Sequence, residues 1–212
     1  MRIAILIAAL LFSGPLTAAK KKKASASPTF AYYLLTLSWA PDFCAQTNSK
    51  EPAECGPGRK VGFVVHGLWP QGETSRGPQN CGGSPVSQSI VQTMLKYIPT
   101  ASLIQHEWAT HGTCSGLSAA DYFAAVRKAR DSVTIPPEFK APAQALKLSP
   151  KAIEDSFATA NPTFPEAAFR TSCTSGRLQE ARICFGKDLS PRACTSSAGE
   201  CTLATMQVLP VR

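Results

Sequence analysis

All three histidines of the chain lie within two short segments, and this concentration is the strongest chemical signal in the sequence. His66 lies in residues 63–70, FVVHGLWP, while His106 and His111 lie in residues 106–114, HEWATHGTC. An isolated histidine more often fills a hydrogen-bonding niche than performs chemistry. Two imidazoles that meet in space suit general acid–base catalysis, because histidine titrates near about 6.5 and the two rings can hold opposite protonation states.

The second segment is predicted to be helical, which would gather its polar side chains on one side. At about 100° per residue, His106, Glu107, Thr110 and His111 fall within an arc of about 140°. The pattern is close to the H-E-x-x-H zinc motif, but its two histidines are five positions apart instead of four. An angle of about 140° between them suits one metal ion poorly, so we expect an acid–base site without a metal or another cofactor.

RNA is the substrate that best suits such a pair of histidines. It carries its own nucleophile, the 2′-hydroxyl, so one imidazole can remove that proton while the other donates a proton to the departing 5′-oxygen. A third cationic group can offset the charge on the phosphate. A DNase is the weaker interpretation because DNA lacks the 2′-hydroxyl, and a zinc hydrolase is disfavoured by the histidine spacing.

The order of the expected elements indicates an α+β fold. Apolar or alternating runs predict strands at residues 30–39, 61–65, 178–185 and 203–211, the second ending directly at His66. Apolar residues at helical spacing predict helices at residues 86–97, 101–110 and 118–130, and a fourth that begins at Ser149 and Pro150. Residues 41–57 and 71–87 are predicted to be loops. This order favours a mainly antiparallel sheet flanked by helices.

The N-terminus has the features of a secretory signal peptide over residues 1–19. It contains Arg2, a short apolar core and small residues before a cut after Ala19, with a cut after Ala26 as the alternative. An apolar run of about ten residues is too short to span a bilayer, which needs roughly 20, so we expect no stable membrane insertion after cleavage. Residues 20–29 are predicted to be a flexible basic tail, and residues 30–212 a catalytic domain.

The net charge of +8 supports an anionic partner only weakly. Without Arg2 and the four lysines at positions 20–23, the chain carries 17 basic and 14 acidic residues, a net charge of +3. The folded body is therefore only mildly basic, and the lysine run can equally be a solvated tail.

The eight cysteines all follow the expected signal peptide. An even number in an exported chain indicates disulfides, and zinc is less favoured because no two cysteines have the C-x-x-C spacing of structural zinc sites. Eight cysteines allow 105 pairings, so the pairing stays open at this point.

The two histidine segments resemble the signature segments of the ribonuclease T2 family. His66 to Pro70 matches the family segment H-G-L-W-P in full, and residues 106–114 match H-E-W-x-K-H-G-T-C except at Thr110, where the family has lysine. The order and spacing of the cysteines extend the similarity from about Phe30 to the C-terminus. The resemblance implies cleavage of single-stranded RNA through a 2′,3′-cyclic phosphate to a 3′-phosphate, without a metal.

The resemblance also implies a role for each catalytic residue. His111 would be the general base for the 2′-hydroxyl, and His66 the general acid for the leaving oxygen. His106 would hold the phosphate, with Glu107 beside it helping to stabilise the transition state. The alternative is an RNA-binding or toxin-like protein of the same fold in which catalysis is secondary.

Further positions are implied to contact the substrate. Trp69 would form an aromatic wall for the base upstream of the cut, with a core tryptophan as the competing interpretation. Thr110 stands where the family's lysine would approach the phosphate. Leu103 and Ser38 stand where many relatives have an aromatic residue and a glutamine for the downstream base, which leaves base preference open.

The resemblance suggests a disulfide pairing as well. The implied pairs are Cys44–Cys55, Cys81–Cys114, Cys173–Cys201 and Cys184–Cys194. We expect an exported monomer, either periplasmic or secreted, and the prokaryote-like length of the signal peptide favours the periplasm.

Overall fold

The computed structural model describes residues 29–47 and 51–211. The predicted signal peptide, residues 1–19, and residues 20–28 of the predicted basic tail lie outside the described residues. Within the described ranges, no helix is long and apolar enough to cross a membrane.

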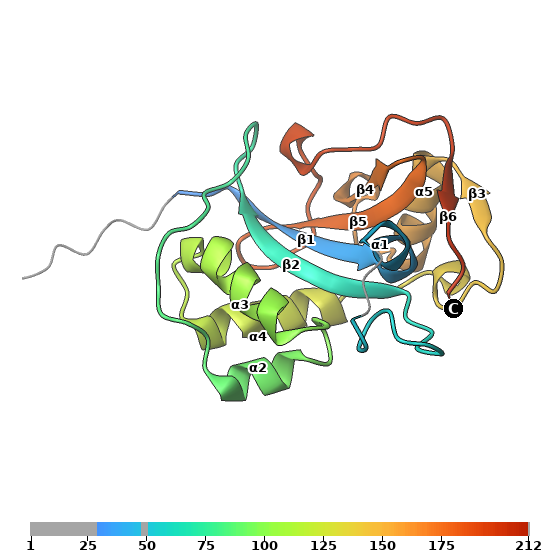
Figure 1. Ribbon diagram of the computed structural model, residues 1–212. Helices are drawn as coiled ribbons and strands as arrows, with labels where there is room; N and C mark the ends of the chain where they lie inside the picture. Colours follow the sequence, from blue (N-terminus) through green and yellow to red (C-terminus); the bar gives the residue numbers. More distant parts are fainter. Residues whose placement is uncertain (1–28, 48–50, 212) are drawn as a thin grey trace, which may run out of the picture.

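A six-stranded sheet runs through the described part of the chain (Figure 1). Its strands are β1 (Tyr32–Trp39), β2 (Phe63–Gln71), β3 (Leu146–Leu148), β4 (Phe169–Thr174), β5 (Arg177–Phe185) and β6 (Met206–Val208). They lie in the order β2-β1-β5-β6-β3, and β4 pairs with β5. Only β5 and β6 pair in parallel, through Arg177 and Gln207. The mainly antiparallel sheet confirms the predicted fold class.

Helices flank this sheet. They are α1 (Ala40–Thr47), α2 (Gln88–Met94), α3 (Ala101–Thr110), α4 (Ala119–Asp131) and α5 (Pro150–Ala160). Short 3-10 helices lie at Gly112–Cys114, Pro137–Phe139, Glu166–Ala168 and Ser196–Ala198. Figure 1 shows α2, α3 and α4 grouped beside β1 and β2, whereas α5 packs against β4.

The main core lies between one face of the sheet and these helices. Leu35, Leu37, Val65, Leu68 and Ile183 are at most 1% exposed and pack with aromatic and aliphatic helix side chains. The other face of β1 is also buried, which explains why this strand has a nearly continuous apolar run instead of a strict alternation.

Two helices begin where the sequence predicts. Ser118 Oγ accepts a hydrogen bond from the backbone N–H of Asp121 at 3.2 Å, which caps α4. Ser149 Oγ accepts from the N–H of Ala152 at 3.1 Å, and Pro150 occupies the first turn of α5.

The prediction of a loop over residues 41–57 is wrong in its first half. Ala40–Thr47 form α1, with Pro41 in the first turn, where a missing N–H costs no helical hydrogen bond. Proline breaks a helix only in its interior, so Pro41 starts this helix instead of preventing it.

Other boundaries also differ from the predictions, and those of the strands depend on pairing partners as well as on local pattern. The helix predicted at residues 86–97 is confined to α2, and the strand predicted at residues 203–211 is reduced to β6. Strands β3 and β4 were not predicted. The three-residue β3 exists through its ladder with β6, and the largely polar β4 through its ladder with β5.

Strand β2 runs through His66, so the predicted strand end at this residue is wrong. Thr36 of β1 pairs with Gly67 and Leu37 pairs with Val65, which leaves His66 as an extra residue between them. His66 therefore lies in a β-bulge, an irregularity that changes the direction of side chains within a continuous strand.

Four disulfides link the described cysteines, and none of those cysteines is free. The pairs are Cys44–Cys55, Cys81–Cys114, Cys173–Cys201 and Cys184–Cys194. These are the pairs that the family resemblance implies. Cys81–Cys114 joins the loop after β2 to the segment that follows α3, so it ties the loop that follows the first histidine segment to the end of the second.

Candidate active site

The bulge in β2 places His66 and Trp69 on the same face of the sheet. Residues three positions apart point to opposite faces of a regular strand, and one extra residue brings them back to the same face. Val65 and Leu68 point the other way, into the core. The rings of His66 and Trp69 consequently lie edge to face, with centroids 5.1 Å apart.

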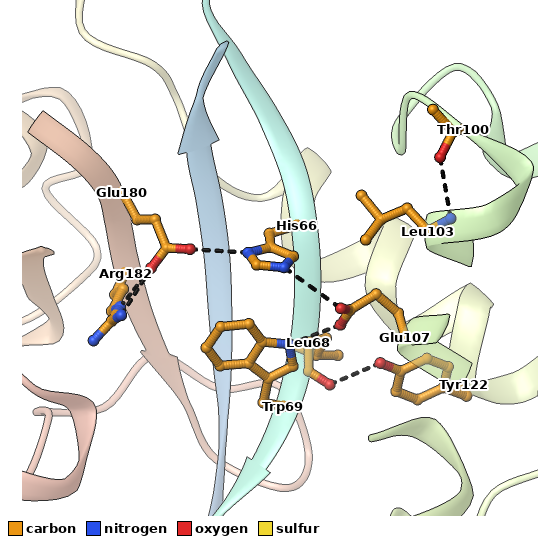
Figure 2. Close-up of polar contacts among 9 residues, drawn as sticks. All are labelled: His66, Leu68, Trp69, Thr100, Leu103, Glu107, Tyr122, Glu180 and Arg182. Carbon is orange, nitrogen blue, oxygen red and sulfur yellow. Dashed lines mark hydrogen bonds and ion pairs between the residues drawn. The ribbon is translucent and has the colours of Figure 1, made fainter. Parts of the chain in front are cut away.

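Glu107 reaches from α3 to both side chains (Figure 2). Trp69 Nε1 donates to Glu107 Oε2 at 2.7 Å, and His66 Nε2 lies 3.6 Å from Glu107 Oε1. A Cβ on Gly67 would overlap Glu107 Oε2, so glycine is needed for this close approach. Glu107 Oε1 is buried and has no hydrogen-bond partner among the described residues, with His66 Nε2 as the charged group beside it.

His111 lies at the C-terminal end of α3 and stacks on Trp69. The two ring centroids are 5.1 Å apart and the ring planes differ by 28°. The N–H of His111 still bonds to the carbonyl of Glu107, at 3.0 Å, so the helix fixes its backbone. Trp69 therefore contacts both histidines, with its ring nearly perpendicular to that of His66 and stacked on that of His111.

The surroundings shift the pKa values of the two histidines in opposite directions. Burial lowers the pKa of His111 to about 4, and the positive charges of His66 and His106 act in the same direction. Burial also lowers the pKa of His66, but the hydrogen bond to Glu180 and the charges of Glu107 and Glu180 outweigh it, so the pKa rises above 6.5. Between these two pKa values, His66 is protonated and His111 is neutral.

The carboxyl group of Glu107 is also unusual. Burial raises its pKa to about 7, although the charge of His66 and the hydrogen bond from Trp69 oppose this rise. A carboxyl group with this pKa can be a neutral hydrogen-bond donor as well as an anion near neutral pH.

Two residues of the site, Glu180 and Arg182, were not predicted. Glu180 Oε1 is 2.9 Å from His66 Nδ1, and Arg182 donates to Glu180 Oε2 from Nε at 3.0 Å and from Nη2 at 2.8 Å. Both lie on β5, two positions apart and hence on one face. The sequence signal that could have indicated them is a pair of opposite charges, E-A-R at residues 180–182, directly before the apolar residues 183–185 of the same predicted strand.

His106 and Thr110 also lie on α3. His106 is exposed, and its charge helps to lower the pKa of His111, so it is within electrostatic range of that ring. The carbonyl of Thr110 accepts a hydrogen bond from the N–H of Asn80 at 2.8 Å. The substrate-binding roles of both residues stay predictions.

Two cavities adjoin the histidine pair, one at each ring. The cavity at His66 has a volume of about 290 Å³ and is lined by Ser38, Phe43, Glu51, Glu54, Val64, Val65, His66, Thr100, Ser102 and Leu103. The cavity at His111 has a volume of about 270 Å³ and is lined by Leu34, Trp69, Gln71, Arg76, Gln79, His111, Arg182, Ser197 and Ala198. Ser38 and Leu103 thus lie in the same cavity as His66, and Trp69 lies in the other with His111.

Known proteins share this sequence pattern and fold. A "Probable ribonuclease" of Haemophilus influenzae is 31% identical over 179 residues, which cover 78% of this chain and 61% of that protein. A "Ribonuclease" of Aeromonas hydrophila is 40% identical over 93 residues, which cover 44% of this chain and 41% of that protein. The chain therefore spans less than two thirds of the length of either relative.

A solved structure and a family model extend the likeness over most of the chain. Ribonuclease MC1 from the seeds of bitter gourd has a TM-score of 0.63 and 25% identity, with 84% of this chain and 99% of that chain covered. The sequence model of the Ribonuclease T2 family matches residues 30–194, a range that includes both histidine segments and seven of the eight bonded cysteines. On this match, the chain belongs to the ribonuclease T2 family.

Proposed function

We propose that this chain is an endoribonuclease that cleaves single-stranded RNA by metal-independent acid–base transesterification. The observation that carries the proposal is the meeting of two histidines around one tryptophan ring, with opposite protonation preferences. A neutral His111 suits a general base, and a protonated His66 suits a general acid.

The reaction then proceeds in two steps. First, the 2′-oxygen bonds to phosphorus and the bond from phosphorus to the 5′-oxygen breaks. His111 takes the proton of the 2′-hydroxyl, and His66 gives its proton to the departing 5′-oxygen. Water subsequently opens the 2′,3′-cyclic phosphate to a 3′-phosphate, with the two histidines in exchanged roles.

The two cavities support this assignment of acid and base. The nucleoside that leaves must lie beside the general acid, and the cavity at His66 adjoins that ring. The nucleoside that keeps the phosphate must lie beside the general base, and the cavity at His111 contains Trp69, a surface on which a base can stack. We infer that the two cavities hold the downstream and the upstream nucleoside.

Groups around the phosphate would stabilise its charge in the transition state. Glu107 in its neutral form could donate from Oε1 to a phosphate oxygen, and His106 would add positive charge. Thr110 brings no charge, but Arg76 and Arg182 line the cavity at His111. These two arginines are candidates for the cation that the family's lysine would otherwise supply.

We further propose that the mature protein is exported, to the periplasm or the medium, and acts as a monomer. Four disulfides support export, because disulfides persist in oxidising compartments and are rare in the cytosol.

The pH dependence of kcat/KM should be bell-shaped. His111 must be neutral, so kcat/KM should rise with pH through about 4, and His66 must be protonated, so it should fall again above 6.5. Initial rates on a dinucleotide across roughly pH 3–9, a range that extends well below and above the ordinary histidine pKa, check this. An acidic limb centred above the ordinary histidine pKa would contradict the base role of His111.

The function itself is tested by incubating the protein with single-stranded RNA and DNA of the same sequence in excess EDTA. We expect complete cleavage of the RNA and none of the DNA. Cleavage that EDTA abolishes would support a metal-dependent hydrolase instead. Tight binding of intact RNA without cleavage would support the RNA-binding alternative.

A further inference from the structure

We propose that Glu180, held in place by Arg182, is a positioning residue that fixes His66 as the proton donor to the leaving oxygen. This inference rests on the proposed function and adds to it a residue of β5. Figure 2 shows the arrangement: Glu180 reaches across β1 to one nitrogen of His66, while the other nitrogen faces Glu107.

The surroundings of Glu180 stabilise its ionised form although the side chain is buried. The residue is only 4% exposed, and an unpaired carboxylate at such a place would be strongly disfavoured. Arg182 provides two N–H donors to Oε2, and Ser172 Oγ donates to the same oxygen at 3.2 Å. Burial raises the pKa of Glu180, but His66 and Arg182 outweigh it and lower that pKa below 4.5.

An ionised Glu180 sets the tautomer of His66. A carboxylate can only accept, so Nδ1, at 2.9 Å from Oε1, must carry a proton. Nε2 is then the nitrogen that gains and loses the exchangeable proton, and it faces the site, 3.6 Å from Glu107 Oε1. The first reaction step needs a proton on Nε2, and the second step needs the lone pair of Nε2. The hydrogen bond between Nδ1 and Glu180 therefore supports both steps.

The charges around His66 also favour its protonated form. The titratable and charged groups that act on it are Glu54, Glu107, His111, Glu180 and Arg182. Of the carboxyl groups among them, Glu54 and Glu107 have pKa values raised to about 7, whereas that of Glu180 is lowered, so Glu180 is the one that keeps its charge as the pH falls below 7. Glu180 is therefore the carboxylate that stabilises the imidazolium, through its contact with Nδ1 at 2.9 Å.

Arg182 is anchored independently of the histidine. Its Nη1 donates to the carbonyl of Ala198 at 2.7 Å, and the guanidinium lines the cavity at His111. The carboxylate is thus held between a fixed arginine and the catalytic ring, which is the arrangement expected of a group that orients a histidine rather than one that only fills the sheet.

The test compares two substrates that differ in their need for an acid. An RNA dinucleotide expels a nucleoside 5′-oxygen that needs a proton, whereas a uridine 3′-(4-nitrophenyl) phosphate expels a nitrophenolate that does not. We expect Glu180→Gln to lower kcat/KM for the dinucleotide roughly 10–100-fold, the usual cost of losing a group that orients a functional histidine. With the nitrophenyl ester, we expect no change beyond about threefold, and the basic limb of the pH profile should move to lower pH.

Glu154→Gln is the matched control. Glu154 accepts hydrogen bonds from Thr171 N and Oγ1, both at 2.9 Å, between α5 and β4. Thr171 and Ser172 are neighbours on β4, so their side chains point to opposite faces of the sheet, and the loss of Glu154 should leave both rates unchanged. An equal loss with both substrates, or no loss with either, would overturn the role of Glu180. His66→Ala distinguishes failure of this inference from failure of the proposed function. If His66→Ala does not lower the rate on the dinucleotide more than the rate on the nitrophenyl ester, His66 is not the general acid.

A measurement on the unaltered protein covers the case in which Glu180→Gln does not fold. Nitrogen-15 histidine spectra should show neutral His66 as the Nδ1–H tautomer and its titration above 6.5. A neutral Nε2–H tautomer, or titration below 6.5, would overturn the inference.

Discussion

Replacing His111 or His66 with alanine is expected to lower kcat for RNA cleavage by roughly 10²–10⁴-fold, the contribution of a general base or acid. His111→Ala removes the only described ring that is stacked on Trp69 and is neutral over most of the active pH range. His66→Ala removes the proton donor while leaving Glu107 and Trp69 bonded to each other.

Binding should survive both substitutions, because the cavities contain many other groups. The measurement is therefore kcat on RNA beside the Kd for a 2′-deoxy analogue, with thermal unfolding as the check on folding. Near wild-type turnover by either folded variant would refute the assignment of that histidine.

The second large effect is expected from the substrate. A single 2′-O-methyl group in an RNA oligonucleotide should abolish cleavage of the bond on its 3′ side and leave every other bond cut at its normal rate. The reason is that the methyl group removes the proton that His111 takes and blocks the internal nucleophile. Mapping the fragments by mass spectrometry checks this.

The control is the same oligonucleotide with the methyl group one nucleotide away. Cleavage at the methylated position in the first oligonucleotide would mean that water or another external nucleophile attacks, and the two-histidine mechanism would fail.

Much of the fold could be predicted because it depends on local patterns. Ser118 and Ser149 mark helix starts through side chains that cap nearby N–H groups. Residues 178–185 alternate in a way that predicts β5. The short strand β3 exists through its ladder with β6, so no local pattern reveals it, and the same dependence shortens the predicted strand at residues 203–211 to β6.

The candidate site could be predicted only in part. The histidines were evident from their grouping, and the family resemblance supplied their roles. The bulge at His66 could not be predicted, because it depends on the register against Thr36 and Leu37 of β1, which are far from His66 in sequence. Glu180 was missed for the same reason: it is 114 positions from His66 and meets it only when β5 and β2 pair on either side of β1.

The most direct test of the central claim is the chemistry of the first product. RNA should be incubated briefly with the protein in excess EDTA, and the new ends identified by mass spectrometry. The mechanism predicts that 2′,3′-cyclic phosphates appear first and then convert to 3′-phosphates, with a free 5′-hydroxyl on the other fragment. Fragments that carry 5′-phosphates, or an absence of any cyclic intermediate with cleavage dependent on metal, would contradict the proposal that His111 and His66 drive attack by the 2′-hydroxyl.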